Sequence, residues 1–318
     1  MCIEFSMHYT ESYMKRVIIT GATGMVGATM IEHMLKDNIE ITAIMRPSSA
    51  KRSNIPASPY LKCIECDIDN LLSLKDVLQQ GYDTFYHFAW NGTFGSSRDD
   101  VRLQTQNIKD TLDAIELANY VGCKVFVGAG SQAEFGPVEG IISDNLPKNP
   151  VTGYGIAKLS ACNMGRLLCE QYGMRFNWGR IVSTYGPRDN NYTMVMSSII
   201  HMLNGERMQF TKGEQIWDYL YGGDCSRAFY LIGKYGKHGK AYTIGSGQSR
   251  YLKDYITTIR DVVNPNLEIG IGEIDYYPNQ VMKLCADIDE LTKDTGFLPE
   301  VSFEEGIKKT IEWYRGKN

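Results

Sequence analysis

The sequence predicts an α/β fold in which helices cover both faces of a doubly wound parallel sheet and a smaller C-terminal α/β lobe follows. Two observations predict it. Short apolar runs rich in β-branched residues alternate with helix-period segments through the first 182 residues. After about Thr184 the alternation weakens, and Gly, Asn, Tyr and charged residues become frequent. With 318 residues, 43% of them hydrophobic, the chain can bury a large core.

Six apolar runs are the strand candidates of the sheet. They cover residues 17–20, 39–45, 60–66, 83–89, 124–129 and 174–182. Strands buried on both faces of a parallel sheet appear as such continuous apolar runs, and the crossovers between them are usually helical. Residues 101–120 and 153–172 show the clearest helical spacing among these crossovers.

The C-terminal part predicts further helices and one returning strand. Helices are expected at residues 193–203, 224–235, 252–263 and 303–314, and a strand at 241–244 that rejoins the main sheet. We therefore expect a first domain at 14–182, joined by a returning segment near 220–260. The smaller lobe would take 183–219 and 261–318, and residues 1–13 would be an N-terminal extension or a start-site artefact.

Composition excludes several classes of function. A net charge of −4 with 22% charged residues creates no field that would attract nucleic acid or an anionic membrane. No stretch approaches the roughly 18 apolar residues of a membrane span, and residues 1–13 lack the apolar core of a signal peptide. Eight scattered cysteines, several in apolar runs, are typical of reduced thiols in a cytoplasmic protein. Cys63 and Cys66 have the spacing of a redox or zinc pair, but no further ligands lie nearby, so we predict no metal site.

A glycine turn after the first strand predicts a dinucleotide-binding, Rossmann-type domain. Gly21-x-x-Gly24-x-x-Gly27 lies between a strand candidate and a helical pattern. Backbone N–H groups at the start of that helix would attract a pyrophosphate, and glycines allow the close approach. The alternative is an ordinary tight turn between strand and helix. The predicted contacts are Gly21, Thr23, Gly24, Met25, Val26 and Gly27.

The end of the second strand indicates which dinucleotide binds. NAD-binding proteins usually place a carboxylate there for the adenine ribose, whereas this strand ends at Arg46, with Lys51 and Arg52 close behind. An arginine suits a 2′-phosphate, so NADP is favoured over NAD, the alternative being a solvated basic loop. Asp67 after the third strand either hydrogen-bonds the adenine amino group or ends the strand in a turn.

Three polar residues predict proton transfer coupled to hydride transfer. Tyr154 and Lys158 are four residues apart on a predicted helix, so they share a face. The ammonium is expected to lower the tyrosine pKa from about 10, and the phenol could then exchange a proton with a carbinol. Ser131, at the carboxyl end of the fifth strand, could polarise the substrate oxygen. Asn107 either supports the lysine through a water or is a polar residue on a helix face.

These motifs resemble the extended short-chain dehydrogenases/reductases, the epimerase/dehydratase group that acts on nucleotide-activated sugars. The resemblance spans nearly the whole chain from Met14. It rests on Gly-Ala-Thr-Gly-Met-Val-Gly at 21–27, His-Phe-Ala at 87–89, Gly-Ser-Gln-Ala-Glu-Phe-Gly at 130–136 and Tyr-Gly-Ile-Ala-Lys at 154–158. It continues at 180–187, 217–219, 242–247, 295–297 and 303–307.

The resemblance implies further site residues and a homodimer. Lys158 would also hold the nicotinamide ribose. Residues 101–120 and 153–172 would pair with their copies in a four-helix interface. The implied cofactor contacts are Ile68, Phe88, Ala89, Trp90, Asn107, Tyr154, Lys158 and Ile181. The implied substrate contacts are Asn91, Thr93, Gln132, Ser183 and Trp217, where Trp217 either stacks on a nucleobase or packs in the core.

Departures from the family pattern bear on the substrate. Arginines that bind the diphosphate in relatives are replaced by Trp217 and Tyr277. Lys212, Lys283 or backbone amides would have to bind the diphosphate instead.

Other differences from the family pattern indicate which of the family's reactions to expect. The dehydratases carry Asp-Glu after the catalytic hydroxyl residue, whereas Gln132 and Ala133 follow Ser131. Glu134 is expected on an extended segment, facing another way. The 130–136 stretch resembles CDP-abequose and CDP-paratose synthases, which implies NADPH-dependent reduction of a 4-keto-6-deoxy nucleotide sugar with Tyr154 as proton donor or acceptor. The alternatives are a nucleotide-sugar epimerase with retained cofactor and a non-catalytic dinucleotide sensor, a class that typically loses the tyrosine or the lysine.

Overall fold

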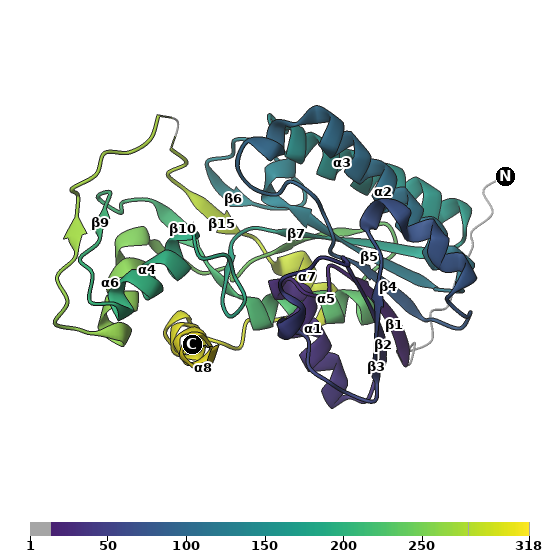
Figure 1. Cartoon of the computed structure of the whole chain (residues 1–318). Helices are drawn as coiled ribbons and strands as arrows, with labels where there is room; N and C mark the ends of the chain where they lie inside the picture. Colours follow the sequence, from purple (N-terminus) through teal and green to yellow (C-terminus); the bar gives the residue numbers. More distant parts are fainter. Residues whose placement is uncertain (1–13, 279, 318) are drawn as a thin grey trace.

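A computed structural model describes residues 14–278 and 280–317, and the expected extension at 1–13 lies outside them. A seven-stranded parallel sheet forms the centre of the molecule (Figure 1). Its strands in spatial order are β12 (Ala241–Ile244), β7 (Arg175–Ile181), β5 (Val125–Ser131), β4 (Thr84–His87), β1 (Arg16–Thr20), β2 (Glu40–Met45) and β3 (Leu61–Glu65). The doubly wound parallel sheet is confirmed, including the returning strand β12 beside β7.

The strand order reverses at β1, which pairs with β2 on one side and β4 on the other. In open α/β sheets the crevice at the carboxyl ends of the strands, at this reversal, is where ligands bind. Thr20, Met45 and His87 end β1, β2 and β4. The topology therefore places the glycine turn and the end of the second strand at one edge of the sheet.

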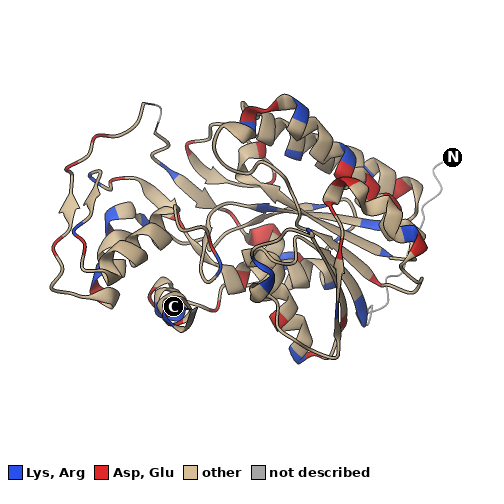
Figure 2. Cartoon of the chain, viewed as in Figure 1, with Lys and Arg blue, Asp and Glu red and all other residues tan. Residues whose placement is uncertain are grey.

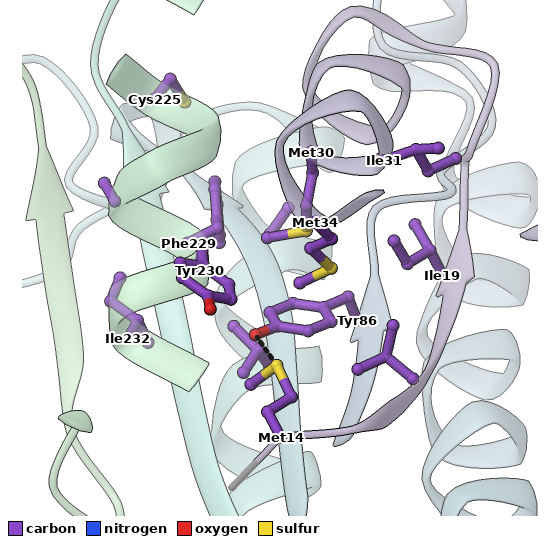
Figure 3. Close-up of a cluster of buried hydrophobic side chains, with 14 of the residues drawn as sticks. Met14, Ile19, Met30, Ile31, Met34, Tyr86, Cys225, Phe229, Tyr230 and Ile232 are labelled. Carbon is purple, nitrogen blue, oxygen red and sulfur yellow. Dashed lines mark hydrogen bonds between the residues drawn. The ribbon is translucent and has the colours of Figure 1, made fainter. Parts of the chain in front are cut away.

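One face of the sheet is covered by α1 (Met25–Lys36), α5 (Gly222–Tyr235) and α7 (Asp289–Thr295). Figure 3 shows the cluster beneath them, in which Met30 and Met34 of α1 meet Phe229 and Ile232 of α5 above the ring of Tyr86. All five of these side chains are buried. Apolar positions at helical spacing therefore dock both helices on the sheet.

The other face is covered by α2 (Val101–Tyr120), α3 (Gly153–Gln171) and the 3-10 segment η2 (Ile68–Asp76). Aromatic rings stack across three neighbouring strands beneath these elements. Phe85, Phe126, Phe176 and Trp178 lie in sequence with centroids 5.7, 6.2 and 5.9 Å apart. Gly128 makes room for the last ring, since a Cβ there would lie 2.1 Å from an atom of Trp178.

The C-terminal lobe has a separate apolar cluster formed mainly by α4 (Met194–Leu203), α6 (Leu252–Val263) and α8 (Phe303–Lys317). Four short strand pairs surround it and join it to the sheet. They are β6 (Gly140–Ile142) with β15 (Leu284–Ala286), β8 (Thr184–Tyr185) with β11 (Leu220–Tyr221), β9 (Gln209–Phe210) with β14 (Gly270–Ile271), and β10 (Ile216–Asp218) with β13 (Ser249–Tyr251). The expected assignment of residues 183–219 and 261–318 to the C-terminal lobe stays a proposal. In the structure, α6 packs in this cluster, whereas α7 packs against the sheet domain.

Acidic and basic residues are interspersed along the helices and loops in the view of Figure 2. Within the part of the chain that the structure describes, no helix has the length and apolarity needed to cross a membrane. The seven cysteines in that part are free thiols, and only Cys63 is exposed.

Candidate active site

The glycine turn forms a tight cradle between β1 and α1. Gly21 adopts φ +67°, and a Cβ there would lie 2.7 Å from the Ala89 backbone nitrogen. A Cβ on Gly27 would lie 2.4 Å from the carbonyl oxygen of Gly21. Gly24 precedes α1 and offers no side-chain cap. The first N–H groups of α1 therefore face outward from a turn that only glycine can form, which suits a phosphate.

A cavity of about 520 Å³, hereafter the switch-point cavity, lies at the carboxyl ends of β1, β2 and β4. It brings together ten of the predicted contacts: Gly21, Thr23, Gly24, Arg46, Ile68, Phe88, Ala89, Trp90, Asn91 and Thr93. It also contains residues that sequence reasoning missed, among them Ser48, Ser49, Cys66 and Asn190. Ser48 and Ser49 lie two and three residues after Arg46 and could have been found from that proximity.

Arg46 and Lys51 place positive charge at the cavity wall formed by the segment after β2. The ammonium of Lys51 donates to the side-chain oxygen of Asn190 at 3.3 Å, so the C-terminal lobe reaches this end of the cavity. Arg52 instead pairs with Glu65 at the surface. Of the three basic residues named from the sequence, two therefore line the cavity.

Several predicted cofactor contacts do not line the switch-point cavity. Met25 lies near Gly222 of α5, and the carbonyl of Val26 accepts from the Ser226 hydroxyl at 3.0 Å. Asp67 is exposed and precedes η2 without a side-chain cap bond. Ile181 is the partly buried last residue of β7.

Tyr154 and Lys158 lie on the first turns of α3, whose N-terminus is capped by the Thr152 hydroxyl. Both side chains are buried and face the same side, with the Lys158 ammonium 5.8 Å from the centroid of the Tyr154 ring. The ammonium donates to the Ala129 carbonyl at 2.6 Å and lies 3.6 Å from the ring centroid of Trp90. Trp90 also meets Tyr154 edge to face, at 6.1 Å between centroids.

Burial dominates the ionisation of both residues. It lowers the pKa of Lys158 to about 7, against the opposing charge of Glu134. It raises the pKa of Tyr154, so the expected lowering by the lysine is wrong for this structure. A hydrogen bond with Ser131 and the charge of Arg98 oppose that rise, while the Lys158 ammonium is held on Trp90 and the Ala129 carbonyl.

Arg98 is a cation that the sequence did not single out. It lies on the 3-10 segment η3 (Gly95–Asp99), with its guanidinium 4.5 Å from the ring centroid of Tyr154. Asp99 accepts from the Gly153 amide at 2.9 Å, which ties η3 to the start of α3. No motif signalled this contact because η3 and α3 are far apart in the sequence.

Ser131 ends β5 and caps a 3-10 turn, η4 (Gln132–Glu134). Its hydroxyl accepts from the Ala133 amide at 3.2 Å, and its own amide donates to Glu134 at 2.9 Å. Glu134 is fully buried, and it lies on a tight turn and not on the expected extended segment. Gln132 begins this turn and is partly exposed.

Two buried amides on α2 hold the loop after β4. Asn107 accepts from the Asn91 amide at 2.9 Å and donates to the Asn91 carbonyl at 2.8 Å. Gln104 accepts from the Trp90 indole at 2.9 Å and donates to the Gly92 carbonyl at 2.9 Å. Asn107 is therefore a buried clamp on the loop that lines the cavity, and its partner Gln104 was missed. A helix with buried amides at i and i+3 is the signal that could have found both.

The predicted substrate residues Ser183 and Trp217 meet each other, with the indole N–H donating to the serine hydroxyl at 3.0 Å. Trp217 is partly buried and packs against the apolar clusters of the C-terminal lobe. His87 lies beneath the site, where burial and Lys158 lower its pKa to about 3 and keep it neutral. Over residues 14–278 and 280–317, no three His, Cys, Asp or Glu side chains gather to hold a metal ion.

The chain is similar in sequence to one family of known proteins. The model of the NAD dependent epimerase/dehydratase family matches residues 17–245. The dTDP-glucose 4,6-dehydratase of Escherichia coli is 30% identical over 172 residues, which cover 52% of this chain and 48% of that enzyme. A trifunctional Arabidopsis thaliana enzyme, a UDP-glucose 4,6-dehydratase, UDP-4-keto-6-deoxy-D-glucose 3,5-epimerase and UDP-4-keto-L-rhamnose-reductase, is 24% identical over 94% of this chain and 47% of its own. The chain thus spans about half the length of these two relatives.

Two solved structures share the fold. The UDP-N-acetylglucosamine 4-epimerase of Methanobrevibacter ruminantium, in complex with UDP-N-acetylmuramic acid, superposes with a TM-score of 0.87 and 23% identity over 96% of this chain and 99% of that one. The UDP-glucuronic acid 4-epimerase of Bacillus cereus, in complex with NAD, gives a TM-score of 0.81 and 21% identity over 95% of this chain and 99% of that one.

Proposed function

Because the chain belongs to the NAD dependent epimerase/dehydratase family of nucleotide-sugar enzymes, we propose that it is an NADPH-dependent reductase of a 4-keto-6-deoxy sugar carried on a nucleotide. The observation that carries the proposal is the pairing of Arg46 at one end of the switch-point cavity with Tyr154 and Ser131 beyond Trp90. Arg46 and Trp90 both line this cavity, and Trp90 in turn contacts Tyr154, which supports a 2′-phosphate site and a proton donor that serve one bound dinucleotide.

The chain's own residues divide the work of the reaction. Tyr154 gives its proton to the carbonyl oxygen of the sugar as that carbon is reduced. Ser131, hydrogen-bonded with the tyrosine, donates to the same oxygen and stabilises its developing negative charge. Lys158 binds the nicotinamide ribose. A bound nicotinamide dinucleotide supplies the hydride.

The residues present suit such a cofactor. The Gly21 and Gly27 positions exclude any side chain, and the cavity passes from the glycine turn to the aromatic ring of Trp90. Asn107 holds Asn91 and the adjoining loop, so its proposed part is indirect. We keep Met25, Val26, Asp67 and Ile181 as proposed contacts at the margin of this cavity.

The test is consumption of NADPH with defined substrates. Purified protein would be mixed with NADPH and with 4-keto-6-deoxy sugars linked to CDP, dTDP, UDP or GDP, each prepared with a separate dehydratase. We expect one nucleotide to support stoichiometric NADPH oxidation and a reduced sugar product. The reductase assignment would be abandoned if every substrate left NADPH unoxidised.

A nucleotide-sugar epimerase with retained cofactor is the second candidate, favoured by the similarity of the fold to two 4-epimerases. It predicts that dinucleotide stays bound through purification and that substrate isomerises without net consumption of NADPH. A non-catalytic sensor is disfavoured, since both Tyr154 and Lys158 are in place.

Reversing the charge of Arg46 tests the cofactor preference. Arg46→Asp should raise the Kd for NADPH by about 10- to 100-fold, because a carboxylate repels the 2′-phosphate, and should leave NADH binding equal or tighter. Fluorescence titration with each dinucleotide measures this. Arg52→Asp is the matched control, since Arg52 pairs with Glu65 outside the cavity. Equal losses for NADPH and NADH in Arg46→Asp would contradict the preference.

We propose that the protein is a homodimer through α2 and α3, which lie side by side in Figure 1. Ile156, Met164 and Leu167 share one face of α3 and are 51%, 48% and 51% exposed. Exposed apolar side chains at helical spacing mark a contact surface. Leu167→Glu should halve the mass measured by light scattering, whereas Ile271→Glu on β14 should not. A wild-type monomer at micromolar concentration would remove the proposal.

A further inference from the structure

Glu134 is a fully buried carboxylate directly behind the reaction site. One oxygen accepts from the Ser131 amide and from the Trp178 indole, both at 2.9 Å. The other accepts from the Arg180 guanidinium at 2.7 Å. A buried charge is costly unless it is paired and hydrogen-bonded, and this one is satisfied on both oxygens.

The first of these bonds acts on the geometry of Ser131. The serine and the glutamate form a capping box around η4, with the hydroxyl accepting from one end of the turn and the carboxylate accepting at the other. Gly130 leaves the necessary room, since a Cβ there would lie 2.4 Å from the carboxylate oxygen. The direction of the Ser131 hydroxyl therefore depends on Glu134.

The second effect is electrostatic and reaches Lys158. Burial lowers the pKa of Lys158, and Glu134 is the charge that opposes this. The Trp178 ring, which Glu134 binds, lies 5.8 Å from the lysine ammonium. Trp178 thus lies next to both groups, with its indole N–H on the carboxylate and its ring near the ammonium.

Other ionisable groups surround this set. Arg180 on β7 also donates to Asp144 at 3.1 Å, and Lys148 follows on the same loop as Asp144. Cys162 lies beside Arg180, while Tyr154 on α3 and His87 on β4 complete the surroundings. Arg180 therefore has a second carboxylate partner in Asp144. For this reason, the need to neutralise Arg180 does not by itself explain the carboxylate of Glu134.

We propose that Glu134 is a positioning residue for the reaction, because its carboxylate holds the turn that carries Ser131 and supplies a negative charge that offsets the burial of the Lys158 ammonium. The proposal rests on the proposed function only in placing Ser131 and Lys158 at the reacting atoms. It adds a residue that acts through both of them.

The experiment follows dinucleotide binding against pH, so it needs no sugar substrate. The probe is NADPH, or NADH if wild type binds that more tightly, titrated by fluorescence from pH 6 to 9 on full-length protein. At each pH, the contribution of Lys158 to dinucleotide affinity is the difference in affinity between wild type and Lys158→Met. We expect wild-type affinity to fall as pH rises through about 7, where Lys158 loses its charge. In Glu134→Gln that midpoint should move down by about one pH unit, which weakens binding up to about tenfold between the two midpoints.

Asp144→Asn is the matched control, because it removes the other carboxylate on Arg180 without touching Ser131. It should lose stability but keep the wild-type midpoint. Glu134→Asp keeps the negative charge on a shorter side chain. It should therefore show the wild-type midpoint, although its carboxylate no longer reaches the Ser131 amide. When Glu134→Gln is combined with Lys158→Met, the dinucleotide affinity should be the same as that of Lys158→Met alone.

The outcomes separate the proposal from a purely structural role. If Glu134→Gln loses stability as Asp144→Asn does but keeps the wild-type midpoint, Glu134 is only part of the core and the proposal fails. If Glu134→Gln does not fold, Glu134→Ala takes its place: a midpoint about one pH unit lower supports the proposal, and an unchanged midpoint overturns it. Failure of the reductase assay would leave this binding result standing, so the two proposals are judged apart.

Discussion

Replacing Tyr154 by phenylalanine is expected to lower kcat by about 10²- to 10⁴-fold while leaving dinucleotide affinity within about twofold. Under the proposed function the phenol hydroxyl transfers the proton, and its removal also takes away the hydrogen-bond partner of Ser131. The ring itself should stay in place, since Trp90 and the Arg98 guanidinium hold it from two sides.

Turnover of Tyr154→Phe would be measured with whichever nucleotide sugar supports NADPH oxidation, or isomerisation under the epimerase alternative. Tyr172→Phe, just beyond the end of α3, is the control and should behave as wild type. Retention of more than about a tenth of wild-type kcat would exclude Tyr154 as the proton donor under both functions. A matching loss of NADPH affinity would indicate disturbed packing.

Replacing Lys158 by methionine is expected to stabilise the protein, although it should weaken the binding of NADPH. The lysine is buried, and its pKa falls from 10.5 to about 7 on folding. Below pH 7 the folded protein must bury the charge, at a cost on the order of a few kcal/mol. Between about pH 7 and 10 the unfolded chain binds more protons than the folded one, so wild-type stability rises with pH and the cost disappears.

Urea unfolding at pH 6.5 and at pH 9 would measure this difference. Lys158→Met should be more stable than wild type at pH 6.5, and the advantage should shrink by about 1.4 kcal/mol for each pH unit above 7. Lys62→Met, on an exposed position of β3, should show no such dependence. A variant less stable than wild type at pH 6.5 would mean that the ammonium is well compensated by Glu134 and the Trp90 ring.

The surroundings of the Lys158 ammonium explain the free-energy cost of burying it. The ammonium is packed between aromatic rings and one carbonyl, which orient it well but replace few of the hydrogen bonds it would make in water. Glu134 offsets part of the desolvation. Under the proposed role of Lys158, the protein gives up stability where dinucleotide binding needs a fixed positive charge.

The sequence by itself determined the parallel sheet and the glycine cradle, and it singled out the three polar residues of the proposed reaction. Parallel strands buried on both faces must be apolar throughout, so the runs at β1, β2 and β5 were visible without any knowledge of contacts. Gly21 and Gly27 were predicted from their spacing between a strand and a helix, and the structure shows that a Cβ does not fit at either position. Tyr154 and Lys158 were predicted because helical spacing puts them on one face.

Only the tertiary structure decided how these residues are tuned. Arg98, Gln104 and Glu134 reach the site from other elements, and no spacing in the chain connects them to Tyr154 or Lys158. Burial also reversed the expected ionisation, since a pKa depends on the surroundings of a group in three dimensions and not on its sequence neighbours. The local sequence pattern therefore identified the groups that we propose to react, whereas packing across the sheet set their charges and directions.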